Sequence, residues 1–235
     1  MLEFFTIGFL LGLSHSTDAD HLSAISSILI ENNSLLNALK IGSVWGLGHS
    51  LTLLVMGATS LMLGAKIPEN ISNLLEIIVG FMLVALGANV FRKLLLKTSH
   101  LHLHSHNKKQ HFHAHCHNNK TIMGDHRKEQ HSHEHHPTSL LKSLSVGVMH
   151  GIAGSAVLII LVMQTATSFS NGLLYIAIFG IGSIIGMASL SVVIFYPLHL
   201  SKGRFNLTHK TIQFSIASIT VALGLYIIIA GFWYQ

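Results

Sequence analysis

The sequence predicts an all-α membrane protein with six transmembrane helices, and three observations lead to this prediction. Half of the 235 residues are hydrophobic and only 10% are charged, whereas a soluble domain carries about a quarter charged residues. Most of the charged side chains lie in one stretch, residues 92–142. The rest of the sequence divides into six apolar segments, each long enough to cross a bilayer, which takes roughly 20 helical residues.

The expected spans cover residues 3–29, 38–64, 72–91, 140–165, 172–198 and 211–233. The chain starts Met-Leu-Glu and lacks the basic region that opens a secretory signal peptide, so we expect the first span to stay in the working protein. The first three spans (1–97) and the last three (139–235) form two transmembrane halves. The segment 98–138 joins them.

The basic residues predict which side of the membrane each loop faces. Arg92 and Lys93 follow the third span and Lys202 follows the fifth, whereas the opposite side carries only Lys66. Cytoplasmic loops are enriched in lysine and arginine. The loop 98–138 should therefore be cytoplasmic and both termini outside, in a plasma (inner) membrane. The net charge of +5 then reflects this topology and a basic loop, and not a nucleic-acid site.

Faint internal similarity indicates that the two halves are repeats. Three short motifs recur in the same order in the second half, at a nearly constant separation along the chain. Three spans per unit would place the halves in opposite orientation, and inverted repeats are a recurrent architecture of transporters. The alternative is a shared pattern of small residues that lets helices approach closely. The matches are GLSH at 12–15 with GVMH at 147–150, GSVWG at 42–46 with GSIIG at 182–186, and VALG at 84–87 with VALG at 221–224.

The first span contains four ionisable side chains, His15, Asp18, Asp20 and His21, within seven residues of an otherwise apolar segment. Such groups are costly in hydrocarbon and indicate an ion or substrate site. Imidazole and carboxylate together suit a first-row divalent metal ion. The alternative is a structural network of salt bridges, although buried ion pairs seldom stabilise a fold more than apolar packing does.

The spacing of these residues predicts a distorted helix. On a regular helix His15, Asp18 and His21 fall within an arc of about 120°, whereas Asp20 points to nearly the opposite side. The three residues also rise through almost two turns, which is too far for one ion. We therefore expect a break near residues 16–17. The alternative is that only some of the three bind the ion at once.

Further candidates lie in other spans. His49, in a glycine-rich part of the second span, and His150, which matches His15 in the repeat, are each either a ligand or a partner in helix–helix hydrogen bonding. Ser155 and its neighbouring glycines permit close packing or an irregular backbone. Glu76 opens the third span, where it is either solvated at the membrane interface or placed to orient a metal-binding imidazole.

Two of these motifs together resemble those of a known family. His15, four further residues, Asp20 and His21 are similar to the HX4DH signature of the nickel/cobalt permeases, and the Gly-His-Ser sequence at His49 resembles their second motif. With six spans and the small residues after His150, the chain resembles the compact urease-accessory branch, and it lacks the acidic second-half motif of the larger eight-span permeases. The resemblance implies recognition and transport of Ni²⁺ or Co²⁺ by His49 and the four ionisable residues of the first span.

The segment between the halves is rich in histidine, with 13 of the 19 histidines in residues 100–136. Such tracts bind metal ions, and Cys116, the only cysteine, leaves no internal disulfide. Because the loop has few apolar residues, we expect disorder without metal and a role as a metal buffer beside the pore. The alternative is a solvated linker that binds metal adventitiously. The buffer candidates are His102, His104, His113, His115, His117, His133 and His135.

These features predict a secondary transporter of Ni²⁺, with Co²⁺ as the second candidate ion, and not an enzyme. Uptake is favoured because the urease-accessory branch supplies nickel to enzymes; the alternative is efflux, with the loop collecting cytoplasmic metal. No ATP-binding motif occurs, so an ion gradient or the membrane potential would drive transport. A thiol–disulfide electron carrier needs paired cysteines, and a membrane metalloenzyme needs a general-base motif that the sequence lacks. Besides the metal ion and the bilayer, expected partners are a metallochaperone and further copies of the chain; no cofactor is expected.

Overall fold

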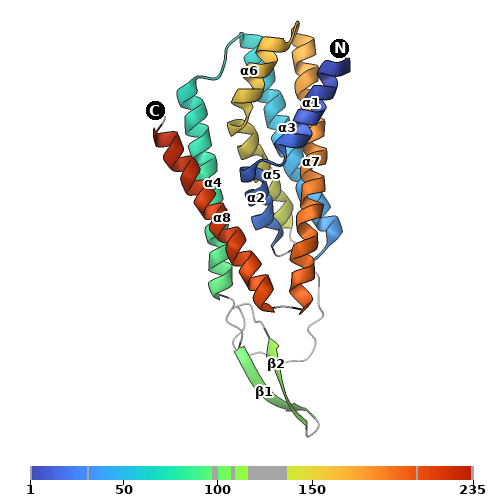
Figure 1. The fold of residues 1–235 in the computed structure, drawn as a ribbon, viewed down its shortest axis with the longest axis vertical. Helices are drawn as coiled ribbons and strands as arrows, with labels where there is room; N and C mark the ends of the chain where they lie inside the picture. Colours follow the sequence, from blue (N-terminus) through green and yellow to red (C-terminus); the bar gives the residue numbers. More distant parts are fainter. Residues whose placement is uncertain are drawn as a thin grey trace.

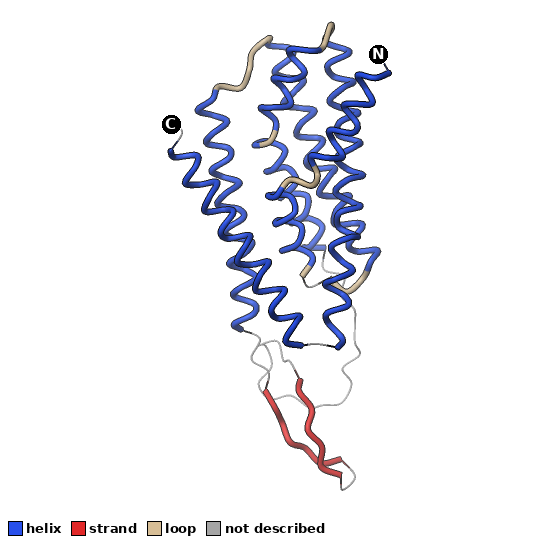
Figure 2. The backbone as a smooth tube through the Cα atoms, in the orientation of Figure 1, coloured by secondary structure: helices blue, strands red, loops and turns tan. Residues whose placement is uncertain are grey.

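The computed structural model describes residues 2–30, 32–96, 100–106, 109–115, 137–204 and 206–233. In these ranges, helices lie side by side along the long axis of the molecule, and a two-stranded hairpin projects from one end (Figures 1 and 2). The helices are α1 (Leu2–His15), α2 (Ala19–Leu29), α3 (Leu35–Leu63), α4 (Glu69–Leu96), α5 (Pro137–Ala153), α6 (Ser155–Thr165), α7 (Phe169–Arg204) and α8 (Asn206–Trp233), and the strands are β1 (His100–His106) and β2 (Lys109–His115).

The first apolar segment is broken where its ligand spacing predicts a distortion. Helix α1 ends at His15 and α2 begins at Ala19. Ser16 and Thr17 donate hydrogen bonds from their hydroxyls to the carbonyls three residues earlier, each at 2.7 Å. Asp18 then takes an extended conformation (φ −60°, ψ 148°). Short polar side chains that bond to the local backbone offer it an alternative to the helical ladder, so the prediction of a break is confirmed.

The fourth apolar segment is broken as well. Helices α5 and α6 meet at Gly154 and are bent by 52° relative to one another. The amide of Gly154 still donates to the carbonyl of His150 at 2.8 Å, and the hydroxyl of Ser155 donates to Ile152 at 2.8 Å. The irregular backbone that the small residues permit is therefore present, one turn after His150.

Four described helices, α3, α4, α7 and α8, are long and apolar enough to cross a membrane, and the bent pair α5 and α6 is a fifth candidate if the two helices form one broken span. Helices α1 and α2 are not among them; the segment that they share contains His15, Asp18, Asp20 and His21. The sixth span therefore stays a prediction. Large apolar side chains cover the outside of the bundle, such as Leu51 and Val55 of α3 and Phe214 and Ile219 of α8. This is the surface expected of helices that face lipid.

The core of the bundle surrounds α3, which packs against α5 and α7. Trp45 of α3 and Met187 of α7 are fully buried there. Glycines bring the helix backbones into contact, because a methyl group at Gly12 of α1 would collide with the backbone of Phe179 in α7. A methyl group at Gly147 of α5 would collide with the backbone of Trp45 in the same way. Close approach at small residues is how helices associate in a membrane, where apolar burial contributes little.

Part of the histidine-rich segment forms an antiparallel hairpin in which His100 pairs with His115 and His106 with Lys109. In these two strands the chain forms a hydrogen-bonded ladder where the sequence predicts disorder; the alternation of histidine with other residues has the period of two that suits a strand. His102, His104, His113 and His115 lie on the strands. The other buffer candidates, His117, His133 and His135, and Cys116 lie outside the described residues.

Candidate metal centre

The break between α1 and α2 joins His15 to Asp18. Nδ1 of His15, the last residue of α1, lies 2.9 Å from a carboxylate oxygen of Asp18, the residue immediately before α2. The carboxylate can only accept, so Nδ1 carries the proton and donates it to Asp18. Nε2 of His15 is then left with its lone pair available to a ligand.

The start of α2 places Asp20 and His21 in the same cluster. Nδ1 of His21 donates to Asp20 at 3.0 Å, and the other oxygen of Asp20 lies 3.6 Å from Nε2 of His150. A regular helix through residues 15–21 would point Asp20 away from the other candidates. Because the expected break is present and α2 begins anew at Ala19, Asp20 instead faces α5.

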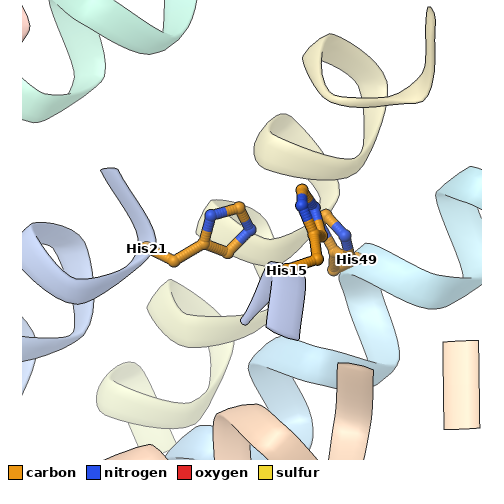
Figure 3. A group of neighbouring side chains, drawn as sticks. All are labelled: His15, His21 and His49. Carbon is orange, nitrogen blue, oxygen red and sulfur yellow. The ribbon is translucent and has the colours of Figure 1, made fainter. Parts of the chain in front are cut away.

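A group of three imidazoles forms where α1, α2 and α3 meet. His15, His21 and His49 offer ring nitrogens that lie within 4.8 Å of one another, and their ring centroids are 4.7 to 5.2 Å apart. Figure 3 shows the ring of His21 facing the rings of His15 and His49, which overlap in this view, with His49 entering from α3. We call these three residues the imidazole triad.

The nitrogens of the triad have no hydrogen-bond partners where they face one another. In the part of the chain that the structure describes, Nε2 of His15, Nε2 of His21 and both ring nitrogens of His49 are buried and have no hydrogen-bond partner. Buried polar atoms are nearly always paired, and one without a partner costs about 1–3 kcal/mol. A bound cation would take the lone pair of one nitrogen from each ring, whereas the second nitrogen of His49 carries the ring proton and is a donor. Imidazole held by a carboxylate on its far nitrogen is the usual arrangement around a metal ion.

The two aspartates supply the charge that a buried dication requires. Asp18 accepts a hydrogen bond from Nδ1 of His15, and one carboxylate oxygen of Asp20 accepts a hydrogen bond from Nδ1 of His21. Two carboxylates would balance the two positive charges of the ion, and a charge without compensation is expensive to bury. Of the five residues that the sequence predicts as ligands, the structure thus brings three imidazoles together and places both carboxylates as hydrogen-bond partners of two of them.

His150 stands next to the triad. Its Nδ1 donates to the carbonyl of Val146 at 3.1 Å, which fixes its tautomer. Its ring centroid lies 4.7 Å from that of His21. With Asp20 and His21 it forms a second group of ligand atoms within 4.8 Å of one another.

Aromatic rings that the sequence interpretation missed cover the centre. Trp45 lies 5.3 Å from His21 and 5.7 Å from His150, centroid to centroid, and Phe179 lies 5.5 Å from His15. Trp45 could have been found, because it precedes His49 by four residues and so shares its helix face. Phe179 gives no such signal, since only tertiary packing brings α7 to α1.

A cavity of about 510 Å³ opens beside the histidines. Its polar lining comes from Ser14, His15, Asp18, Asp20, Glu76 and His150. The side chain of Glu76 is exposed and reaches this cavity from α4. Ser155 is buried, with its hydroxyl bonded to the backbone of Ile152 at the junction of α5 and α6.

Comparison with known proteins identifies the family. Over 232 residues the chain is 33% identical to the urease accessory protein UreH of Bacillus sp. (strain TB-90), covering 96% of this chain and 90% of that protein. It is 21% identical over 226 residues to a candidate nickel/cobalt efflux system of Methanocaldococcus jannaschii, covering 94% and 89%. The chain belongs to the nickel/cobalt permease family. It is also 22% identical to the Arabidopsis thaliana chloroplast protein FOR GROWTH AND FERTILITY 2, of which it spans 56%. No family model and no solved structure matches it.

Membership of the nickel/cobalt permease family confirms the family that the sequence resemblance predicts. The permease is a transport protein for a divalent metal ion and not an enzyme. Together with its long apolar helices, this makes it a multi-pass membrane protein.

Proposed function

We propose that this permease is a secondary transporter that takes up Ni²⁺, or Co²⁺, through the imidazole triad. The observation that carries the proposal is the convergence of buried, unpaired imidazole nitrogens from His15, His21 and His49. Imidazole suits Ni²⁺, Co²⁺, Cu²⁺ and Zn²⁺, whereas Mg²⁺ and Ca²⁺ prefer oxygen ligands. A site built from nitrogen would therefore discriminate against the abundant hard cations.

Binding at the triad would need only small movements. Bonds from imidazole nitrogen to a first-row divalent ion are about 2.0–2.1 Å long. Ligand atoms on one ion are therefore at most about 4.2 Å apart, compared with separations of up to 4.8 Å in the triad. The break beside His15 gives the backbone the freedom to close this difference. Discontinuous helices are common at transporter sites for this reason.

We further propose that the two halves form an inverted repeat, which matching contacts support. Gly12 of α1 packs against the backbone of Phe179 in α7, and Gly147 of α5 packs against the backbone of Trp45 in α3. If the halves are aligned so that Gly12 corresponds to Gly147 and Trp45 corresponds to Phe179, the two contacts become equivalent. The corresponding residues are separated by nearly the same number of positions in both cases. The histidines follow the same alignment, since His15 lies against Phe179 and His150 against Trp45.

The packing of α4 on α8 supports the same symmetry. Gly80 contacts Ile228, and Gly224 contacts Val84. If Gly80 corresponds to Gly224 and Val84 corresponds to Ile228 in the other half, these two contacts are equivalent. For the second and third spans, the alignment of the two halves from these contacts differs from the alignment of the short sequence motifs. The shift between the two alignments is roughly two helical turns.

An inverted repeat provides a mechanism for alternating access. The halves would rock about the triad and open it to each side in turn, with both broken helices next to the ion. For a dication moving inward, a membrane potential of 100 mV supplies roughly 4.6 kcal/mol. Both ends of the described chain lie away from the hairpin in Figure 1. This arrangement supports the proposed topology, with the termini outside and the histidine-rich loop in the cytoplasm.

Efflux is the second candidate function, because the Methanocaldococcus jannaschii relative is named as a candidate efflux system. In that case the loop would gather cytoplasmic ions. The name of the Bacillus relative, a urease accessory protein, favours uptake. Cellular nickel content decides between the two: expression raises it if the protein imports the ion and lowers it if the protein exports it.

Flux through the site is tested in proteoliposomes with radioactive Ni²⁺ and an inside-negative potential. We expect wild-type protein to accumulate the ion and His15→Ala to abolish accumulation. Asp18→Ala should reduce it, because His15 loses its hydrogen-bond acceptor. Undiminished flux in both variants would exclude the triad as the transport site.

A further inference from the structure

A second group of ligand atoms lies beside the imidazole triad and shares His21 with it. Asp20, His21 and His150 offer ligand atoms within 4.8 Å of one another. Nε2 of His150 is buried, lies 3.6 Å from a carboxylate oxygen of Asp20 and has no hydrogen-bond partner among the described residues, and Nδ1 of the same ring is engaged by the backbone of Val146. His150 is therefore oriented as a ligand, although it comes from the second half of the chain.

The two groups differ in how they meet the cavity. Asp20 and His150 line it, together with His15, Asp18 and Glu76, whereas His21 and His49 are not among its lining residues. Asp18 is the most open of these carboxylates that pair with histidine, with 54% of its side chain exposed. An ion in the cavity can therefore reach Asp20 and His150 of the second group and His15 of the triad, whereas His49 lies outside the cavity lining.

We propose that Asp20, His21 and His150 form a second ion position on the cavity side, from which the ion passes to the imidazole triad. This inference rests on the proposed function. The second position contains a carboxylate as a direct ligand, and a negative charge attracts a hydrated dication more strongly than neutral imidazoles do. The triad offers three nitrogen ligands and selects the softer ions.

The shared histidine makes the two positions alternatives. Nδ1 of His21 donates to Asp20, so Nε2 is the atom that it offers to an ion. One lone pair bonds one ion, and the positions are filled in turn. During transfer the ion loses Asp20 and His150 as ligands and gains His15 and His49, while it stays bonded to His21. The dehydrated ion is therefore never without a protein ligand.

Trp45 provides a local probe of both positions, because its ring lies 5.3 Å from His21 and 5.7 Å from His150. Co²⁺ quenches indole fluorescence at such short range. The only other tryptophan, Trp233, is replaced by phenylalanine in every variant, so that the signal reports Trp45 in the full chain. The variants are His150→Gln, His49→Gln, the double variant and His199→Gln, a matched change at an exposed histidine outside both groups.

We expect His150→Gln to keep quenching at nearly the parent Co²⁺ concentration, since the triad is intact, but to reduce Ni²⁺ flux at least tenfold. His49→Gln should shift quenching to at least tenfold higher Co²⁺, and the double variant should lose it. His199→Gln should match the parent in both assays. Retention of a soluble, monodisperse protein in detergent shows that each variant is folded.

Three results would overturn the second position. The first is parental flux in His150→Gln, and the second is a loss of quenching in His150→Gln as complete as in the double variant, which would indicate a single four-histidine site. The third is identical quenching in His49→Gln and the double variant. If the parent protein carries no flux at all, the proposed function fails instead, and the quenching comparison still decides whether the second position exists.

Discussion

Replacement of Asp18 by asparagine tests whether the aspartates act through the imidazoles. Asparagine has nearly the same shape and still accepts a hydrogen bond from Nδ1 of His15, now 2.9 Å from the carboxylate, so the variant removes mainly the charge. Loss of such an outer partner lowers metal affinity about 10- to 100-fold. Because 54% of the Asp18 side chain is exposed, water screens its charge. We expect the lower end, a roughly tenfold weaker affinity, or about 1.4 kcal/mol.

The same change at Asp20 should have a larger effect. Asp20 is only 29% exposed and faces both His21 and His150. We expect Asp20→Asn to weaken binding about 100-fold, or about 2.8 kcal/mol. The assay is a Co²⁺ titration of Trp45 fluorescence in the Trp233→Phe background, with the KM for Ni²⁺ flux as an independent measure. Glu69→Gln, a change to an exposed acidic residue in the first turn of α4, serves as the control.

Two outcomes would refute this reasoning. An unchanged Co²⁺ affinity in Asp18→Asn would mean that its carboxylate contributes nothing to the ion. A loss of more than about 1,000-fold would make Asp18 a direct ligand and not a partner of His15, since it exceeds what an outer hydrogen bond supplies.

Three further predictions follow from the packing, the imidazole chemistry and the loop. Gly147→Leu should lower the thermal midpoint in detergent by more than Ala65→Leu does, because the new side chain meets the backbone of Trp45 and overpacking costs about 1–3 kcal/mol; equal midpoints would contradict the close approach of α5 and α3. Ni²⁺ flux should fall as the pH is lowered from about 7.5 to 5.5, since protons compete for imidazole lone pairs, and a flat profile would argue against the triad. Serine in place of His102, His104, His113 and His115 should leave the KM in proteoliposomes unchanged and reduce the nickel retained per cell, whereas a tenfold higher KM would place the loop in the permeation path.

The break in the first span could be predicted because it follows from local chemistry. Ligands at residues 15, 18 and 21 cannot reach one ion on a regular helix, and Ser16 and Thr17 supply hydroxyls that bond to the backbone. Both facts are contained in seven consecutive residues. The family could be recognised for the same reason, since its motifs are short and continuous.

The division of roles within the site could not be predicted, because it depends on contacts between distant segments. His150 meets Asp20 only because α5 packs against α3 and lies beside the start of α2. Phe179 covers His15 through the packing of α7 on α1. The alignment of the two halves that the contacts favour could not be read from the sequence either. Those contacts are made by glycines, and the residues next to these glycines in the sequence differ between the halves.

The most direct test of the imidazole triad is the flux of radioactive Ni²⁺ through His21→Gln in proteoliposomes at a fixed inside-negative potential. His21 belongs to both groups of ligand atoms, so no alternative position can replace it. The structure predicts accumulation below about a tenth of the wild-type rate, because removal of a ligand that acts throughout transfer should lower the rate at least tenfold. The control, His199→Gln, should be indistinguishable from wild type when both variants are reconstituted to the same level. Wild-type accumulation in His21→Gln would contradict the central claim that the ion crosses the membrane through these histidines.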